Sequence, residues 1–497
     1  MKSVRRRWFT GLILLVLMSI LCLIVTGTGG VAAYFLFKSA PPITVILQVI
    51  TATQEVNPPQ LPTAPLEGTP TMAVTAMPQE ETPSVQVTFP VATSPPEEQT
   101  LPPELAAQMA ELEAQVTELR GLQPIAAVPR RWLSITDLRQ RILDDFNQRY
   151  SLKQAQKDAT LWTTLGLLEP GFDLFMFLLQ YQSEREAGFY DPNTKEIYVV
   201  QGKAFDGPAK MAYIREYFQA LQDQYFDLSQ MGYRQRECND NRERCSAIEA
   251  LIEGDASNLE MQWYATYATP QDVAEIEAFL NSYESPVFDR APAFMQQDFI
   301  FPNAYGQVFV ETLHQSGGWE AVNEAYNLPP FSTEQILHPE RYPQDQPSAV
   351  SLPDITQTLG EGWSVMDSGI LGEWFHVLIL GYNNNPLVRL EEDIALKAAE
   401  GWGGDAYLLL ANEASNELLF VLQTVWDTSE DAEEFEKTFG MVAGLQYGNP
   451  ITSQTGINAW NLPHGYGEFH LEDKTTTWII APDSTKALLA WNVIKGQ

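Results

Sequence analysis

The residues that could carry chemistry are few in this chain. It has five histidines, no two of which lie within four residues of each other: His314, His338, His376, His464 and His470. The sequence therefore has no pair of histidines one helical turn apart, the spacing that lets a helix grip one metal ion. It also has no nucleophile elbow, phosphate loop or dinucleotide fingerprint. Glu216 and Glu253 could form the carboxylate pair of a glycosidase, but only scattered tryptophans favour a sugar cleft.

The three cysteines suggest one structural bond. Cys22 lies in an apolar segment near the N-terminus, whereas Cys238 and Cys245 flank six polar residues. These two could close a small disulfide loop in an oxidising compartment, and a pair of free thiols is the alternative. No histidine lies near either of them, which argues against a zinc site.

The elements around the two glutamates follow from local patterns. Residues 187–194 form a turn that opens onto a short alternating strand at 196–200. An amphipathic helix follows over residues 208–228, with Met211, Ile214, Phe218 and Leu221 on one stripe. Further helices are expected at 135–150, 160–168 and 172–180.

Two short motifs come next along the chain. Residues 220–224 read Ala-Leu-Gln-Asp-Gln, and residues 253–256 read Glu-Gly-Asp-Ala. With the turn and strand before them, these motifs resemble bacterial membrane-associated zinc metallopeptidases of the gluzincin type. In that family the Ala-Leu-Gln-Asp-Gln stretch continues a His-Glu-x-x-His helix, and the Glu of Glu-Gly-Asp-Ala is the third zinc ligand. The similarity continues through residues 317–319, 332–340 and 401–405, and so covers most of residues 120–440.

The sequence departs from the family at the zinc ligands. The resemblance places His-Glu-x-x-His on residues 215–219, which read Arg215-Glu216-Tyr217-Phe218-Gln219. Arginine has no lone pair to offer a metal, and Gln219 has only a neutral carbonyl oxygen. Of the three implied ligands only Glu253 remains, whereas open catalytic zinc sites use three protein ligands. We therefore expect no metal, no cofactor and no catalytic residue, with Glu216 as a vestige of the general base.

Other residues could still approach the former site. Asp255 follows Glu253 in the same motif, and His338 lies in the motif at 332–340. Without a metal, Glu253 would be a buried anion that needs a counter-ion. We expect Arg215 to fill the metal position as a replacement cation, with a nitrogen within about 4 Å of a Glu253 oxygen. The alternative is that Arg215 points to solvent beside the groove.

The expected fold class is α+β, with an N-terminal transmembrane helix, a disordered linker, a mainly helical metallopeptidase-like lobe and a C-terminal α+β lobe. In the C-terminal lobe we expect strands at 375–380, 406–411, 418–426 and 477–481 and helices at 391–400 and 431–439. The expected domains are a cytoplasmic basic tail (1–7), a transmembrane anchor (8–37), a Pro/Thr-rich disordered linker (38–102), a short helix or coiled coil (103–122), the metallopeptidase-like domain (123–350) and the C-terminal domain (351–497).

The anchor is predicted from charge and hydropathy. Lys2 and residues 5–7, all arginine, precede a stretch without charged residues from Trp8 to Phe37. About 20 apolar residues span a bilayer, and the positive-inside rule then places the N-terminus in the cytoplasm. The protein is thus expected to be a single-pass cell-membrane protein with its bulk extracytoplasmic. A cleaved signal peptide is the alternative.

A heptad-like stripe suggests a further partner. Leu105, Met109, Leu112, Val116 and Leu119 recur at 4-3-4-3 spacing. Fewer than three heptads are present, so residues 105–119 predict either a weak dimer through a short coiled coil or a helix packed on the body.

Net charge limits the function. The chain carries a net charge of −34, which repels phosphate backbones and argues against a nucleic-acid partner. The expected function is a membrane-anchored extracytoplasmic pseudopeptidase that binds peptides or proteins without cleaving them, or that partners an active homologue. The alternatives are a hydrolase with a rearranged metal site or metal-free carboxylate chemistry, and a structural module of the cell envelope.

Overall fold

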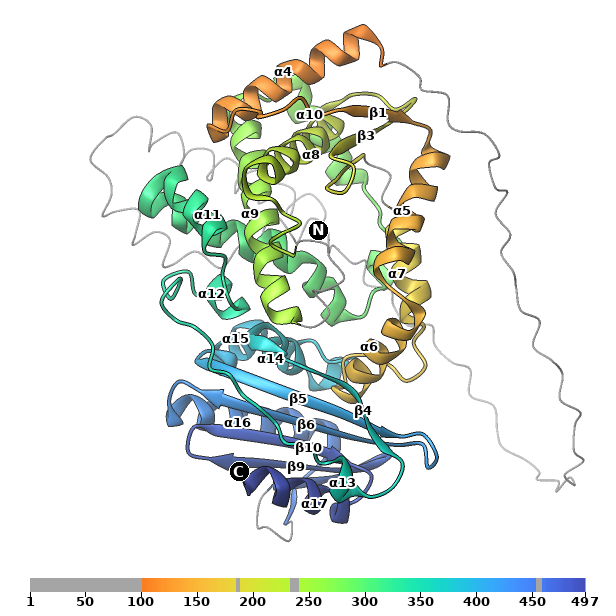
Figure 1. The fold of residues 1–497 in the computed structure, drawn as a ribbon, viewed down its shortest axis with the longest axis vertical. Coiled ribbons are helices and arrows are strands. Elements are labelled where there is room, and N and C mark those ends of the chain that lie inside the picture. The colour runs from red at the N-terminus through yellow and green to blue at the C-terminus, as the bar shows by residue number, and fades with distance from the viewer. Residues whose placement is uncertain (1–100, 185–187, 233–240, 453–457, 497) are drawn as a thin grey trace, which may run out of the picture. The chain divides into compact units, whose positions relative to one another are not determined.

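The computed structural model describes residues 101–184, 188–232, 241–452 and 458–496. Its N-terminal region is mainly helical and its C-terminal region is built on a sheet (Figure 1). The helical region contains α4 (Pro103–Arg120), α5 (Ile135–Arg149), α6 (Leu152–Thr164), α7 (Leu174–Ser183), α8 (Gly207–Phe226), α9 (Arg242–Thr266), α10 (Pro270–Ser282), η2 (Phe288–Arg290), α11 (Ala293–Asn327) and α12 (Thr333–Leu337).

A small sheet accompanies these helices. Its strands are β1 (Arg130–Leu133), β2 (Phe189–Asp191) and β3 (Glu196–Val200), in the order β1-β3-β2. β1 runs parallel to β3, and β2 runs antiparallel to it. β3 therefore lies between the other two strands. Its buried Ile197 packs in the same apolar cluster as Tyr213 and Phe218 of α8.

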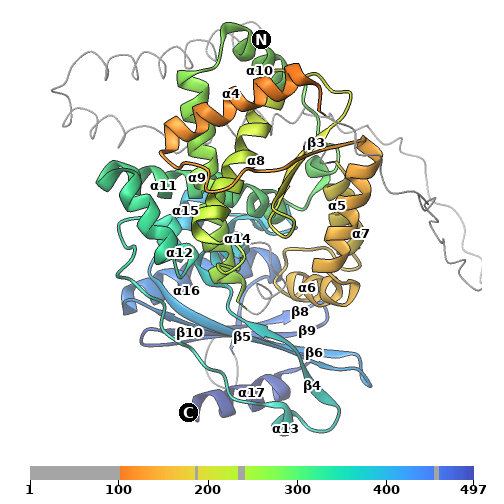
Figure 2. The ribbon, with the colours of Figure 1, turned by 45° about the horizontal axis from the view of Figure 1, so that its top comes forward.

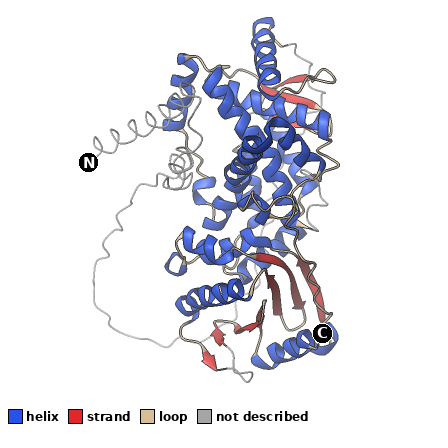
Figure 3. Ribbon diagram, turned by 90° about the vertical axis from the view of Figure 1, so that its left-hand side faces the viewer, coloured by secondary structure: helices blue, strands red, loops and turns tan. Residues whose placement is uncertain are grey.

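The C-terminal region contains an antiparallel sheet with helices on both faces. Its strands are β4 (Trp363–Gly369), β5 (Trp402–Asn412), β6 (Glu417–Trp426), β7 (Ile451–Thr452), β8 (Asn458–Leu462), β9 (Gly465–Glu472) and β10 (Thr475–Ala481). The order is β4-β5-β6-β10-β9-β8-β7. Figure 3 shows the strands gathered in the two sheets, well apart from each other.

Alternating residues of the central strands pack against helices on the two faces of the sheet. Leu409 and Leu422 belong to the core shared with α14 (Gly372–Gly381), α15 (Glu392–Ala399) and α16 (Ser429–Tyr447). Their neighbours Leu410 and Val421 face α13 (Thr356–Leu359) and α17 (Ser484–Lys495). A short helix, η3 (Pro386–Val388), precedes α15. Because successive strand residues point to opposite faces, β5 and β6 are apolar almost throughout.

The helical and C-terminal regions share one hydrophobic core. α11 and α14 meet where the rings of Phe301 and Trp374 stack, with centroids 4.6 Å apart. The same core cluster includes Phe309 of α11 and Phe420 of β6. The two expected lobes are thus packed against each other through apolar side chains rather than joined only by a linker.

Several expected elements are confirmed. The helices expected at 135–150 and 208–228 correspond to α5 and α8, and the strand at 196–200 is β3. In the C-terminal region the strands expected at 406–411, 418–426 and 477–481 lie in β5, β6 and β10, and both expected helices are present as α15 and part of α16. The strand expected at 375–380 is wrong, because these residues belong to α14. Every residue of α14 is buried, and a short, continuously apolar run does not distinguish a strand from a helix that is buried on all sides.

The membrane part of the expected fold class is corrected by the structure. Within the ranges that the structure describes, no helix combines the length and the apolar character that crossing a bilayer requires. The fold class that these residues support is α+β without a transmembrane element, and the membrane partner and single-pass localisation derived from the anchor are corrected with it. The segment on which the anchor was placed, residues 8–37, lies outside the described residues, as do the basic tail and the linker to residue 100.

The expected dimer through residues 105–119 is also corrected. Met109, Leu112 and Val116 of α4 are buried against the same chain, in a cluster with Phe218 of α8 and Leu259 of α9. Figure 2 shows α4 lying across these two helices. The apolar stripe is buried by other residues of the same chain. The prediction of a helix packed on the body is therefore confirmed.

Candidate functional site

The candidate site is built on the antiparallel packing of α8 and α9. α8 begins after Asp206, whose side chain accepts the N–H of Ala209, and α9 begins after Asn241, whose side chain accepts the N–H of Arg244. These caps satisfy amide groups that have no partner inside the helix. The Glu-Gly-Asp-Ala motif lies in the middle of α9, opposite residues 215–219 of α8.

The glycine of this motif is required by the neighbouring helix. A Cβ on Gly254 would lie 2.1 Å from the carbonyl carbon of Gly306 in α11, and one on Gly306 would lie 2.0 Å from the carbonyl oxygen of Ala250. α9 and α11 thus touch backbone to backbone at this point. The contact fixes the axial position of α9, and with it the positions of Glu253 and Asp255.

Arg215 reaches across to α9 and binds acidic residues there. Its Nη1 lies 2.6 Å from Glu253 Oε2, so the contact expected between the two is present. Its Nε and Nη2 donate to the two oxygens of Glu260, at 3.2 and 2.5 Å, and Nη2 also donates to Ser257 Oγ at 3.0 Å. Glu253, Ser257 and Glu260 lie on one face of α9, because residues three and four apart are neighbours on a helix.

Gln219 completes this cluster. Its Nε2 donates to Glu253 Oε1 at 3.1 Å, so both oxygens of Glu253 accept hydrogen bonds from α8. Burial alone lowers the pKa of Arg215, but the charges of Glu260 and Glu253 raise it above its ordinary value. The guanidinium therefore keeps its charge, and it occupies the space between carboxylates that a cation would need. Sequence reasoning missed Glu260, although its position seven residues after Glu253 places it on the same helix face.

Glu216 faces a different neighbour. Because adjacent helix residues are about 100° apart, Glu216 points toward the small sheet while Arg215 points toward α9. Glu216 Oε2 accepts the backbone N–H of Tyr190 in β2 at 2.6 Å, and the residue is only 8% exposed. The carboxylate pair that Glu216 and Glu253 could form in a glycosidase is therefore not assembled: Glu216 contacts the small sheet, and Glu253 is bound by a different side of α8 through Arg215 and Gln219.

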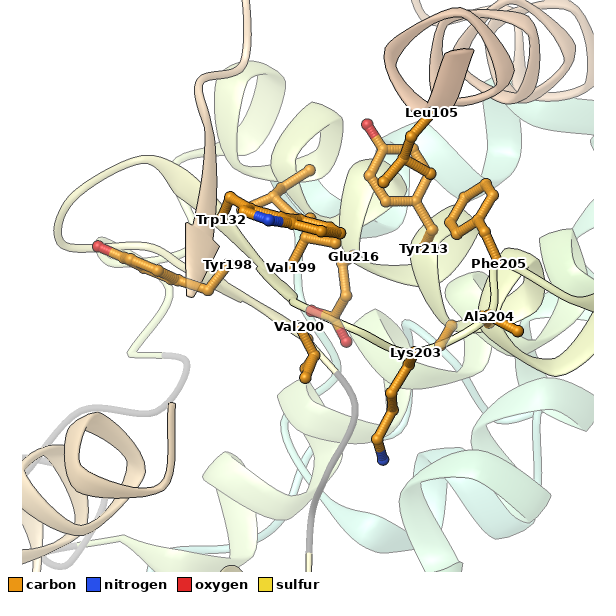
Figure 4. Close-up of a pocket in the computed structure, with 14 residues that line it drawn as sticks. Leu105, Trp132, Tyr198, Val199, Val200, Lys203, Ala204, Phe205, Tyr213 and Glu216 are labelled. Atoms are coloured by element: carbon orange, nitrogen blue, oxygen red, sulfur yellow. The ribbon is translucent and has the colours of Figure 1, made fainter. Parts of the chain in front are cut away.

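An open cavity lies beside Glu216. It has a volume of about 90 Å³, and four residues of one α8 stripe contribute to it, at positions 209, 212, 213 and 216. Figure 4 shows Glu216 among aromatic and aliphatic side chains that come from α4, β1, β3 and α8. The lining residues are Leu105, Trp132, Gly188, Ile197, Tyr198, Val199, Val200, Lys203, Ala204, Phe205, Ala209, Ala212, Tyr213 and Glu216. Trp132 and Leu105 were missed from the sequence because the segment that carries them is distant along the chain.

The other motif residues bind neighbouring segments of the chain through their side chains. Asp255 is bound to Arg120 of α4, with Nη2 to Oδ2 at 3.1 Å, and accepts the hydroxyl of Tyr326 at 2.8 Å. Asp223 accepts the hydroxyl of Tyr190 at 2.5 Å, and the side chain of Gln224 holds the backbone of residues 125 and 126. Asp255 thus belongs to a buried ion pair and does not approach the cavity.

His338 lies in another part of the fold. It follows α12, and its Nε2 is 2.9 Å from Oε1 of Glu373 in α14. Burial lowers the pKa of His338, but the hydrogen bond and charge of Glu373 raise it above the ordinary value. Burial also raises the pKa of Glu373. The structure thus joins His338 to Glu373, not to Glu216 or Glu253.

One acidic group near His338 has the geometry of a cation site. Among the described residues, carboxylate oxygens of Glu334, Asp345 and Asp427 lie within 4.8 Å of one another. Arg341 Nη1 lies between them, at 2.6, 3.3 and 2.7 Å respectively. The guanidinium already supplies the positive charge that these carboxylates need, as Arg215 does for Glu253 and Glu260. The sequence signal for this group is weak: only Asp345 follows Arg341 at a helical spacing.

Of the two cysteines of the expected disulfide, only Cys245 lies among the described residues. Cys245, at the start of α9, is disulfide-bonded, and its expected partner Cys238 lies outside the described residues.

Comparison with known proteins gives one match. Residues 361–489 match a family described as a domain of unknown function (DUF8575), which corresponds to the C-terminal sheet and its helices. No curated protein and no solved structure matches the chain. No metallopeptidase family is among these matches, so the resemblance stays a prediction. The α8–α9 site lies outside the matched segment.

Proposed function

We propose that this chain is a non-catalytic pseudopeptidase that binds peptides in the cavity beside Glu216. The observation that carries the proposal is that two faces of α8 make different contacts. One face of the helix ties Arg215 and Gln219 to Glu253, and the adjacent face lines a cavity next to Glu216. The first face has no metal-binding imidazole at positions 215 and 219, whereas the second presents an open, mainly apolar concavity.

The cavity suits one side chain of an extended ligand. It is smaller than the cavity of about 150 Å³ that binds benzene in an engineered protein interior. Its walls are apolar and aromatic, with few polar groups to fix orientation, as small binding sites commonly are. A purely structural module would have no need to keep this volume unfilled, since protein interiors otherwise pack to near crystal density.

Peptide display against the purified chain tests the proposal. Selected peptides should bind the wild-type protein and lose at least tenfold in affinity with Ala212→Trp, because the indole fills the cavity from its α8 wall. Ala274→Trp is the matched control, since Ala274 is exposed on α10 and outside the cavity. The same peptides should remain uncleaved after prolonged incubation.

Two results would contradict the proposal. Failure to select any peptide, or equal binding to wild type and Ala212→Trp, would remove the cavity as a binding site. Cleavage of the bound peptides that persists in a preparation free of contaminating protease would instead favour the alternative of a hydrolase.

A further inference from the structure

The described part of the chain begins beside the cavity. Its first residue is Leu101, and α4 starts two residues later at Pro103. Leu101 and Leu105 both pack against the apolar cluster that contains Tyr213, and Leu105 and Tyr213 line the cavity. In Figure 4 the side chains of Leu105 and Tyr213 lie next to each other. The segment that precedes residue 101 therefore joins the folded part of the chain close to the cavity.

That preceding segment contains a short apolar stretch. Residues 85–91 read Val-Gln-Val-Thr-Phe-Pro-Val. Val85, Val87 and Phe89 alternate with polar residues, and in an extended chain such alternate residues lie on one side. Phe89 is the only aromatic residue between positions 38 and 100, a range rich in proline, threonine and glutamate. The segment thus offers one aromatic side chain, with valines near it, to an apolar partner.

The walls of the cavity fit such a side chain. The two charged residues of the cavity, Glu216 and Lys203, both interact with other groups of the chain, and the surface offered to a ligand is mainly apolar. Trp132, Phe205 and Tyr213 supply aromatic rings, and contacts between aromatic rings stabilise a complex beyond the area that they bury. A volume of about 90 Å³ admits one side chain. Because the cavity opens to the surface, a phenyl ring can enter it without being fully enclosed.

The chain between the segment and the cavity is long enough to let them meet. Eleven residues separate Phe89 from Leu101, and a chain spans up to about 3.3–3.6 Å per residue, so this connection reaches about 40 Å. The entropic cost of closing such a loop grows only slowly with its length. A ligand on a short tether is present at an effective concentration in about the millimolar range. A segment of modest affinity would therefore occupy the cavity for most of the time.

We infer that residues 85–91 of the same chain bind in the cavity, with the ring of Phe89 packed against Leu105 and Trp132. The site then carries an internal ligand, and a peptide from outside must displace it. The inference rests on the proposed function, in which the cavity binds peptides, and it names a peptide that the cavity binds.

The test offers the same segment as a separate peptide. A fluorescein-labelled peptide with the sequence of residues 83–93 is titrated with the full chain, and binding is followed by fluorescence anisotropy. Phe89→Ser in the full chain removes the ring of the internal ligand, so this variant should bind the probe at least tenfold more tightly than the wild type does. Leu66→Ser is the matched control, because it replaces another apolar residue of the range 38–100, and it should bind the probe as the wild type does.

Further variants locate the binding. Ala212→Trp fills the cavity from its α8 wall, and added to Phe89→Ser it should weaken binding of the probe at least tenfold. Ala274→Trp added to Phe89→Ser is the control, because residue 274 is exposed on α10 and lies outside the cavity. A probe with serine in place of Phe89 should bind the Phe89→Ser chain at least tenfold more weakly than the original probe does.

Each other result overturns the inference. Equal binding of the probe to the wild type and to Phe89→Ser would mean that the internal segment does not occupy the cavity, and the proposed function would stand if Ala212→Trp still weakened the binding. An equal gain with Leu66→Ser would mean that the effect does not depend on Phe89. Binding that Ala212→Trp leaves unchanged would place the segment elsewhere on the protein. If the probe binds neither chain, the segment has no affinity for the cavity, and the display selection with Ala212→Trp decides the proposed function separately.

Discussion

At the scale of single residues, the molecule places arginines where carboxylates converge. Arg215 is bound by Glu253 and Glu260, and Arg341 by Glu334, Asp345 and Asp427. Arg215 uses Nε, Nη1 and Nη2 to bind its two carboxylates, whereas Arg341 contacts all three of its carboxylates through Nη1. A metal ion at either place would need the arginine to leave.

The first prediction concerns the loss of Arg215. Arg215→Ala leaves Glu253 and Glu260 close together without their cation. Removing one partner of a buried ion pair costs about 3–5 kcal/mol, and partial exposure of this cluster reduces the expected loss to about 2 kcal/mol. Unfolding in urea measures it, with the exposed Arg139→Ala as the control. An unchanged midpoint for Arg215→Ala would mean that the pair contributes nothing to stability.

The second prediction concerns restoration of a metal site. Arg215→His with Gln219→His places two imidazoles one turn apart on the α8 face that already contacts Glu253. Three protein ligands then converge, so the double variant should retain about one equivalent of zinc after dialysis, measured by elemental analysis. The single variant Arg215→His is the control and should retain much less. A double variant that retains no zinc would show that Glu253 is not oriented as a ligand.

At the scale of elements, α9 is the helix that organises the site. It carries Glu253 and Glu260 on one face, holds α4 through Asp255, and contacts α11 at Gly254. The position of every group in the Arg215 cluster thus depends on how closely α9 and α11 approach.

The third prediction tests the close contact of α9 and α11 by replacing each of two helical glycines with alanine. Gly254→Ala places a methyl group against the backbone of Gly306 and should destabilise the protein by about 1–3 kcal/mol or more, as overpacking does. Gly440→Ala, in α16, meets no atom within 4 Å and should be neutral or stabilise by up to about 1 kcal/mol, because alanine favours helix. Thermal unfolding compares the two. Equal effects would mean that the backbone contact of α9 and α11 relaxes freely.

The fourth prediction concerns how α4 is attached. Arg120 and Asp255 are both fully buried, and Arg120 also lies over the ring of Trp319, 4.3 Å from its centroid. Arg120→Met leaves Asp255 as an unpaired buried charge and should cost about 3–5 kcal/mol. Adding Asp255→Asn removes that charge and keeps an acceptor for Tyr326, so the double variant should recover at least half of the loss in urea unfolding. No recovery would assign the loss to packing instead of charge.

At the scale of the whole molecule, buried acids mark the junction between the helical region and the C-terminal sheet. Burial and the nearby charge of Glu373 raise the pKa of Glu334 to about 9, against the opposing effect of Arg341. Burial also raises the pKa of Glu243 at the start of α9 and of Asp405 in β5. These side chains come from both regions, so their protonation affects the packing of the whole fold.

The fifth prediction is a loss of stability with rising pH. A carboxyl whose folded pKa is raised stabilises the fold most below its unfolded pKa of about 4.3, and the contribution is lost as the pH rises through the folded value. For Glu334 this window extends from about pH 4.3 to about pH 9. The urea midpoint should therefore be higher at pH 6 than at pH 9, and Glu334→Gln should reduce the difference. Glu340→Gln, whose side chain is 75% exposed, is the control. A midpoint that rises over this range would contradict the assignment.

Local patterns in the sequence were enough to predict the elements that carry the site. The amphipathic stripe of residues 208–228 and the alternation at 196–200 depend only on residues close together along the chain. The contact of Arg215 with Glu253 was predicted from the resemblance together with the charge types, because a buried carboxylate needs a counter-ion.

Only the tertiary structure decided how distant segments complete the site. Glu260 joins the cluster because α9 presents three of its turns to Arg215, and Leu105 and Trp132 reach the cavity because α4 and β1 pack on α8 and β3. The same packing buried the stripe of α4 that the sequence left open for a dimer, placed His338 beside Glu373, and made a helix of the apolar run in α14. Burial of an apolar face is favourable wherever a partner surface is found, and a buried carboxylate is stabilised wherever a donor of opposite charge is found. The identity of either partner depends on residues tens to hundreds of positions away along the chain.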